Sequence, residues 1–429
     1  MASNSSTPFL PTTRREFLSL SSKGIGLLAF SRFAPSFLVR SALASSPAPE
    51  RDKRILVIVQ LAGGNDGLNT LVPYQDDNYY RLRPTLGLPK DTVLALNDRV
   101  GLHPSCDALR GLYDAGSLAL VQNVGYPNPN RSHFRSTEIW ETASDSGAFL
   151  GTGWIGRYLD NACTGAPLAA PEDPLAVHVN TLNGTPETFV GEHEHATFGL
   201  MAYNATHKEN EQSRRFLEKV SDQPSMQEND SASYLRHTLM DTLVTERKVQ
   251  SVIGDYKPAA SYPANPFAAS LRNVAALIAS GISTRVYFVT LNGFDTHVNQ
   301  LATQANLLKQ LSDGLSAFQK DLQAHRLDDQ VVTMTFSEFG RRPSENESKG
   351  TDHGTAAPLF VMGSKVAAGL HGEAPSLSVA HNQDISFSTD FRSVYATLLD
   401  QWMGCPAAPV LGASFDPLPL FAGQKSRTA

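Results

Sequence analysis

Apolar runs that end in glycine or in polar residues predict the strands of this chain. Residues 55–61 (ILVIVQL) form an almost continuous apolar, β-branched run, which is closed by Gly63 and Gly64. Such a run is typical of a strand that is buried on both faces, as in a parallel sheet. The same criterion predicts strands at residues 117–124, 284–291, 330–336 and 359–362.

Several segments between these strands have apolar residues at helical spacing. This spacing predicts helices at residues 132–143, 231–254, 266–280, 298–324 and 391–404. Strands that alternate with helices favour an α/β fold with a mostly parallel sheet and helices on both faces. Residues 145–225 have weak periodicity and many Gly, Thr, Pro and His residues. We therefore expect one domain over residues 45–429, with a loop-rich insertion near 145–225.

The first 44 residues have the pattern of an export signal. Residues 13–18 (TRREFL) resemble a twin-arginine motif, a moderately apolar stretch continues to Val39, and residues 42–44 (ALA) match an A-x-A cleavage site. The apolar stretch is too short and too interrupted to span a bilayer as a helix. We expect recognition by the twin-arginine translocation machinery and a location in the periplasm or outside the cell, not an integral membrane protein. The alternative is a frayed terminus with an incidental arginine pair.

Composition excludes several classes of protein. Of 429 residues, 41% are hydrophobic and 18% are charged, which is enough to form a large core. The formal net charge of −6 and the lack of a basic cluster argue against a nucleic-acid partner. The cysteines, Cys106, Cys163 and Cys405, form no C-x-x-C pair, so they indicate neither a thiolate zinc site nor a disulfide framework, although they allow one bridge.

Polar clusters follow three of the predicted strands. They occupy residues 63–67 (GGNDG), 292–297 (NGFDTH) and 337–341 (SEFGR), and a fourth, 350–354 (GTDHG), precedes the strand at 359–362. Ligands of open α/β sheets bind beyond the carboxyl ends of the strands, so these clusters should meet there. Carboxylates and imidazoles bind divalent metals. The candidate metal ligands are Asp66, Asp295, His297, Glu338, Asp352 and His353.

Each cluster alone also has an ordinary structural explanation. Asp-x-His is common in a turn with a capping aspartate. Glu338 could cap a helix or pair with Arg341, and the Asp352–His353 pair could be solvated loop polarity. What favours a metal site is that three clusters share a position at predicted strand ends.

These motifs together resemble a known family. The twin-arginine leader, the motifs at 63–67, 293–297 and 337–341, and the tripeptides 132–134 (SHF) and 352–354 (DHG) resemble the bacterial family called domain of unknown function 1501. That family is similar to the alkaline phosphatase superfamily, which includes sulfatases. The resemblance covers about the whole mature chain. It implies a three-layer α/β sandwich, alkaline-phosphatase-like, with metal sites at the strand ends.

The resemblance also implies roles for individual residues. Asp66 resembles the first-strand metal ligand, Asp295 and His297 resemble a later Asp and His that bind the other metal, and His353 resembles the final His. Two departures stand out: a single residue separates Asp295 from His297, where the superfamily has three, and Glu338 replaces an Asp-His pair. These departures leave open whether one or two ions bind. The sequence does not identify the metal, which could be Zn, Mn, Ca or Fe.

The nucleophile and the anion contact also have candidates. Ser132 begins a predicted helix, whose N-terminus gathers anions, but serine is also a preferred N-cap residue. His133 could be a base, a substrate contact or a metal ligand. Arg341 could hold phosphate or sulfate oxygens, or could pair with a nearby carboxylate. Formylglycine chemistry is unsupported, because no Cys-x-Pro-x-Arg motif occurs.

The resulting functional expectation is an exported, metal-dependent hydrolase of phosphate or sulfate esters, with sugars or polymers as its substrates. One alternative is a non-catalytic exported protein that binds a glycan or a partner through a degenerate metal site. Another is a protein whose ion serves folding only.

Overall fold

The computed structural model describes residues 54–161, 176–179, 184–193, 195, 197–200, 249–282 and 284–421. The predicted export signal, Cys163 and most of the predicted helix at 231–254 lie outside these residues. The chain divides into two compact units, and every element below belongs to the unit formed by residues 53–202, 257–279 and 284–429. The predicted domain boundaries stay predictions, because the chain around residue 44 and residues 201–248 are not described.

A nine-stranded sheet forms the centre of this unit. Its strands lie side by side in the order β13 (Gly369–His371), β5 (Leu118–Gly125), β12 (Ala357–Met362), β9 (Val331–Phe336), β1 (Ile55–Ala62), β8 (Val286–Asn292), β6 (Ala176–Val179) and β7 (Thr197–Leu200), and β14 (Thr389–Asp390) also pairs with β5. Only β12 runs antiparallel to its neighbours among the described strands of this sheet. The carboxyl ends of β1, β5, β8 and β9 therefore meet at one edge, where β12 begins.

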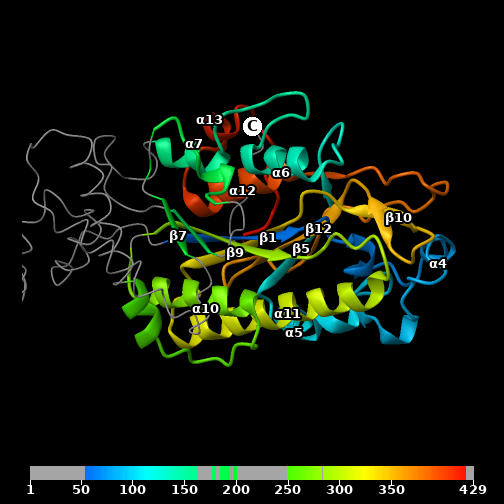
Figure 1. Ribbon diagram of the computed structural model, residues 1–429, viewed down its shortest axis with the longest axis horizontal. Coiled ribbons are helices and arrows are strands. Elements are labelled where there is room, and N and C mark those ends of the chain that lie inside the picture. The colour runs from blue at the N-terminus through cyan, green and yellow to red at the C-terminus, as the bar shows by residue number, and fades with distance from the viewer. Residues whose placement is uncertain are drawn as a thin grey trace, which may run out of the picture. The chain divides into compact units, whose positions relative to one another are not determined.

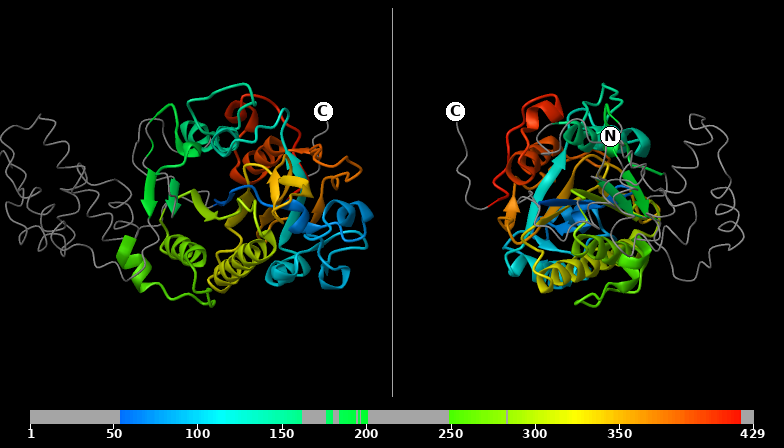
Figure 2. Two further views of the ribbon diagram at one scale, coloured as in Figure 1. Left: turned by 45° about the vertical axis from the view of Figure 1, so that its right-hand side comes forward. Right: turned by 90° about the vertical axis from the view of Figure 1, so that its left-hand side faces the viewer.

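Helices cover both faces of the sheet (Figures 1 and 2). One face carries α5 (Asp107–Asp114), α10 (Pro266–Ala279) and α11 (Gln300–Ala324), and the other carries α6 (His133–Thr142), α7 (Trp154–Asp160), α12 (Phe391–Thr397) and α13 (Ala407–Leu411). A π-helical turn, Leu398–Met403, continues α12. The predicted α/β fold with a mostly parallel central sheet is confirmed.

Apolar packing fixes the α6 side of the sheet. Trp154 stacks on Tyr395 with ring centroids 4.2 Å apart, and Trp140 stacks on Phe391 at 4.3 Å. Together with apolar side chains of the sheet they form one buried cluster. Aromatic stacking of this kind adds about 0.5–1.5 kcal/mol per pair beyond the area buried. The packing holds α6, which begins at the edge where the strands end, in a fixed position.

Smaller elements extend the strand ends. They are a three-stranded sheet of β2 (Leu71–Val72), β4 (Gly101–Leu102) and β3 (Leu94–Ala95), a hairpin of β10 (Arg341–Glu345) and β11 (Thr351–His353), the helix α4 (Asp77–Leu82) and the short 3-10 turns Gly67–Asn69, Lys90–Thr92, Pro104–Cys106 and Glu187–Phe189. The hairpin places Arg341 directly opposite His353.

Two further observations concern cysteines and membrane spans. Cys405 is disulfide-bonded, whereas Cys106 is free and buried. No helix within the described part of the chain is both long enough and apolar enough to cross a bilayer.

Candidate metal centre

Five segments meet at the carboxyl edge of the sheet. Gly63 follows β1, His133 begins the helix after β5, Asp295 follows β8, Glu338 follows β9, and His353 precedes β12. The sequence predicts this convergence for three of them from strand ends alone. The structure adds the segments that carry His133 and His353, because β5 and β12 lie on the β9 side of the sheet.

Gly63 allows the end of β1 to approach the loop after β8. Its φ is +120°, and a Cβ atom on this residue would lie 2.3 Å from the backbone nitrogen of Asp295. A side chain would therefore clash with backbone and force a strained dihedral angle. The glycine is needed to seat Asp295 against the sheet.

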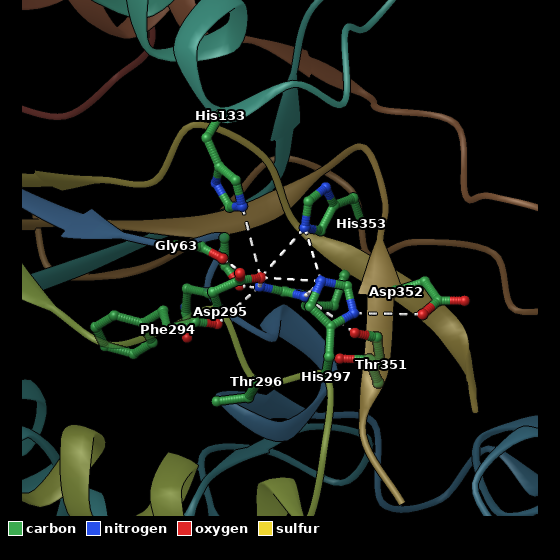
Figure 3. A network of polar contacts seen from close by, with 12 residues as sticks. Gly63, His133, Phe294, Asp295, Thr296, His297, Thr351, Asp352 and His353 are labelled. Carbon is green, nitrogen blue, oxygen red and sulfur yellow. Dashed lines mark hydrogen bonds and ion pairs between the residues drawn. The ribbon is translucent and has the colours of Figure 1, made fainter. Parts of the chain in front are cut away.

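Three imidazoles converge on the carboxylate of Asp295 (Figure 3). Its Oδ1 lies 3.0 Å from Nε2 of His297, 3.2 Å from Nε2 of His353 and 3.5 Å from Nε2 of His133. The Nε2 atoms of His297 and His353 are 2.9 Å apart. His133, Asp295 and His353 offer ligand atoms that all lie within 4.8 Å of one another. Nitrogen and oxygen atoms gathered at these distances suit a single divalent ion.

The opposite nitrogen of each imidazole has an acceptor of its own. Nδ1 of His133 lies 2.8 Å from Oε1 of Glu338, and Nδ1 of His353 lies 2.8 Å from the carbonyl oxygen of Arg131. Nδ1 of His297 lies 3.4 Å from Oδ1 of Asp352. A proton on Nδ1 that is donated outward leaves the Nε2 lone pair facing inward, which is the arrangement of metal-binding histidines.

The pKa shifts of Asp295 and His353 agree with metal binding, whereas that of His133 favours the protonated ring, whose proton a metal ion would have to displace. Burial alone would raise the pKa of Asp295, but the hydrogen bond from Arg341 and the positive charge of that guanidinium lower the pKa to about 2. Burial lowers the pKa of His353. The hydrogen bond to Glu338 raises the pKa of His133, because a protonated imidazole would be stabilised by that carboxylate. A carboxylate and a neutral imidazole are the forms that bind metal.

Arg341 is buried and bonded on all sides. It donates to the carbonyl oxygens of Gly64 at 2.7 Å, Thr351 at 2.9 Å and Phe294 at 2.9 Å, and to Oδ1 of Asp295 at 2.6 Å. This is the pairing with a nearby carboxylate that the sequence left open. Arg341 thus orders three loops and orients Asp295, and its donors are already used within the chain.

The structure places Asp66 away from the imidazoles. Its Oδ1 and Oδ2 accept hydrogen bonds from Arg83 at 2.8 and 2.6 Å, and Gln300 donates to Oδ2 as well. Both side chains of the ion pair have no exposed surface. Because the guanidinium occupies both carboxylate oxygens, the structure corrects the expectation of a metal ligand here: Asp66 is the partner of a buried arginine.

The remaining candidates lie around the cluster. Glu338 and Asp352 bond the outer nitrogens of His133 and His297, so the structure places them one layer outside the ligand atoms. Ser132 is exposed at the N-cap of α6, its side chain makes no capping hydrogen bond, and the structure brings it to no atom of the cluster.

The sequence allows His133 to be a base, a substrate contact or a metal ligand. Its inward Nε2 favours the metal ligand, and its signal in the sequence is its place in the 132–134 tripeptide. Arg83 gave no signal at all, because nothing in the sequence relates it to Asp66.

Comparison with protein families identifies the family of this chain. Residues 52–408 match the family model described as Protein of unknown function (DUF1501). The chain belongs to this family. No protein with a curated description matches it.

Several solved structures resemble this DUF1501 chain. An alkaline phosphatase superfamily protein from Vibrio parahaemolyticus has 12% identity and a TM-score of 0.36, covering 86% of this chain and 71% of its own. The C-terminal periplasmic domain of EptC from Escherichia coli, in complex with Zn, has 9% identity and a TM-score of 0.33, covering 72% and 73%. The lipoteichoic acid synthase LtaP from Listeria monocytogenes has 11% identity and a TM-score of 0.30, covering 74% and 68%.

A cleft of about 460 Å³ opens beside the cluster of the DUF1501 chain. Its volume falls in the range of small-molecule sites, which is about 300–1,000 Å³. Asp295, His133 and Glu338 line one part of it. The rest is lined by Gln60, Ala62, Gly63, Phe134, Thr137, Glu138, Glu141, Gly184, Thr185, Pro186, Glu187, Phe288, Thr290 and Asn292. Ligand atoms of the cluster therefore face a space that could receive a substrate.

Proposed function

We propose that this DUF1501 protein is an exported metal-dependent hydrolase of phosphate or sulfate esters. One divalent ion would be held by His133, Asp295 and His353, with His297 as the fourth ligand. The observation that carries the proposal is the orientation of the three imidazoles: each Nε2 faces Asp295 while each Nδ1 faces an outer acceptor. A solvated loop gives no reason for three histidines to share this arrangement.

The donor set favours zinc or another transition metal. Three imidazole nitrogens and one carboxylate oxygen match the ligands of Zn²⁺, Mn²⁺ or Fe²⁺, whereas Ca²⁺ prefers oxygen ligands throughout. A second ion has no support in Asp66, whose oxygens are paired with Arg83. We therefore propose one ion in place of two. A bound ion of this kind polarises an ester oxygen and makes a water molecule acidic.

The N-terminus of α6 supports an anionic ester as the reacting group. The helix begins at His133, next to the cluster. The backbone N–H groups of His133, Phe134 and Arg135 have no acceptor among the described residues, because the first helical bond is donated by Ser136 to Ser132. Free N–H groups and the helix dipole attract phosphate and sulfate oxygens.

Chain groups near the cluster would hold and orient the reactants. Glu338 accepts from His133 and from the backbone nitrogen of Gly63, so it fixes the ring and can stabilise a proton on it. Arg341 keeps Asp295 ionised and oriented. Half of the Asp295 side chain remains exposed, at 49%, so its position is open to a water molecule and a substrate.

Metal analysis combined with an ester panel tests this proposal. The purified full-length protein is dialysed against Zn²⁺ or Mn²⁺, its metal content is measured, and it is assayed with a chromogenic phosphate monoester, a phosphate diester and a sulfate ester. We expect about one ion per chain and turnover of one ester that a chelator abolishes and added metal restores.

Matched variants make the test specific. Asp295→Ala and His353→Ala should lose the ion and the activity, whereas His381→Ala, which alters an exposed histidine outside the cluster, should keep both. Full metal content in the first two variants would refute the ligand assignment. Stoichiometric metal without turnover of any ester would refute the hydrolase and favour an ion that serves binding or folding.

A further inference from the structure

Two polar side chains interrupt the strands below the cleft. Gln60 and Thr290 are cross-strand partners in β1 and β8, and both line the cleft. The hydroxyl of Thr290 donates to Oε1 of Gln60 at 3.3 Å, and Nε2 of Gln60 has no acceptor among the described residues. Thr290 is buried, whereas Gln60 is only partly buried where its strand reaches the cleft. The floor of the cleft therefore offers a hydrogen-bond donor that the protein itself leaves unused.

One face of α6 forms a wall of the same cleft. His133, Thr137 and Glu141 recur at intervals of four residues and all line it. With a rise of 1.5 Å per residue, the wall extends about 12 Å along the helix from the metal centre to Glu141. The cleft is therefore long enough to receive a group well beyond the reacting ester.

The far end of the cleft is rich in acceptors and has no basic lining residue. Glu138, Glu141 and Glu187 lie there, and none of the described lining residues is Lys or Arg. Arg135 pairs with Glu138 at 2.7 Å, so the acceptors of this end that form no ion pair among the described residues are the carboxyl groups of Glu141 and Glu187. Burial raises the pKa of Glu141 to about 7 and also raises the pKa of Glu187. Phe134 adds an aromatic side chain that is 87% exposed.

We infer that the cleft binds an uncharged, hydroxyl-rich sugar portion of the substrate and disfavours a second anionic group there. The inference rests on the proposed hydrolase, whose reacting ester lies at the metal centre. The donor on Gln60, the hydroxyls of Thr137, Thr185 and Thr290 and the carboxyl groups of α6 match sugar hydroxyls, which both donate and accept. A second sulfate or phosphate would lie beside Glu141 and Glu187, and above about pH 7, where Glu141 is ionised, like charges at close range oppose its binding.

Binding of a disaccharide series tests the inference through a readout other than turnover. Lactose, cellobiose and diacetylchitobiose, each with no, one or two sulfate groups, are titrated calorimetrically into the metal-loaded full-length protein. We expect the singly sulfated sugars to bind, and the second sulfate to weaken binding at least about tenfold. The double variant E141Q/E187Q should reduce the difference in affinity between singly and doubly sulfated sugars to less than about threefold. Gln60→Ala should weaken the binding of every sugar of the series several-fold. Glu373→Gln, an exposed control, should change neither that difference nor the affinities.

The outcomes separate the inference from the proposed function. Equal or tighter binding of the doubly sulfated sugars, an unchanged gap in E141Q/E187Q, or no binding by any member of the series would overturn the sugar cleft. A protein that shows the expected order of binding and hydrolyses no ester would refute the hydrolase and leave the sugar cleft standing. A protein that hydrolyses simple esters and binds none of the sugars would refute the sugar cleft and leave the hydrolase standing.

Discussion

The buried ion pair of Asp66 and Arg83 offers the sharpest test of how this site is built. The sequence predicts that Asp66 binds metal, whereas in the structure the Asp66 carboxylate pairs with Arg83 through two hydrogen bonds of 2.6 and 2.8 Å. These assignments predict opposite results for Asp66→Asn. A ligand variant would lose metal, while an ion-pair variant would lose stability and keep the metal centre.

The size of the stability effect follows from what each variant leaves behind. Arg83→Met leaves a fully buried carboxylate with Gln300 as its one remaining side-chain donor, and such broken pairs cost about 3–5 kcal/mol. Asp66→Asn leaves a guanidinium that still donates to the carbonyl oxygens of Pro343 and Arg342 and to Asn69, so we expect about 2–3 kcal/mol. The double variant removes both charges, and its cost should fall short of the sum by about 2 kcal/mol.

Urea unfolding followed by tryptophan fluorescence measures these free energies. All three tryptophans, Trp140, Trp154 and Trp402, are buried in one cluster of this unit, so the signal reports its unfolding. Metal content is measured on the same samples. If Asp66→Asn lost its metal at unchanged stability, the ion-pair assignment would be wrong and Asp66 would return to the ligand set. Strictly additive costs in the double variant would refute the coupling between the two side chains.

Three further variants probe the surroundings of the site. Glu338→Gln should weaken metal affinity about 10–100-fold in a chelator competition, because His133 loses its outer carboxylate, and wild-type affinity would contradict that role. Glu141 has a pKa raised to about 7 by burial, so the folded state binds its proton more tightly and the free energy of unfolding should fall as pH rises from about 4.5 to 7. Glu141→Gln should remove on the order of 3 kcal/mol of that dependence, and parallel pH profiles would refute the shift. Gly63→Ala should displace Asp295 and lower metal content, which elemental analysis would detect.

Most of the fold was predictable because its elements have local patterns. The five predicted strands begin and end within two residues of β5, β8, β9, β1 and β12. Strands buried on both faces leave long apolar runs, and long amphipathic helices such as α11 leave a clear period. The sequence pattern predicts none of the short strands, namely the two-residue strands, the hairpin of β10 and β11, and the strands β6 and β7. Their pairing depends on distant segments, and runs of two to five residues carry no usable period.

The site was predictable in place but only partly in composition. Parallel strands bring their carboxyl ends together whatever the side chains are, so the pattern places the segments of Asp295, His297 and Glu338 at one edge, where the structure has them. Whether a carboxylate at this edge can bind metal depends on whether an arginine side chain already occupies both of its oxygens. That arginine comes from another segment of the chain. Asp66 meets Arg83, which comes from the C-terminal end of α4, while Asp295 meets three imidazoles from three different segments.

The same reasoning explains why His133 completes the cluster. It follows β5, which is separated from β9 by the antiparallel strand β12, and no pattern in the sequence states that these three strands are neighbours. Once they are, α6 must begin beside Asp295, and its first residue brings an imidazole while Glu338 orients the ring. On the proposed function, one helix would thus supply a ligand atom, free backbone N–H groups for an anion and, two turns later, the carboxyl group of Glu141 in the cleft. On the proposed function, a substitution that shifted α6 would therefore affect metal, ester and sugar binding together, whereas one at His297 would affect the metal and the ester that reacts there and leave the sugar end of the cleft intact.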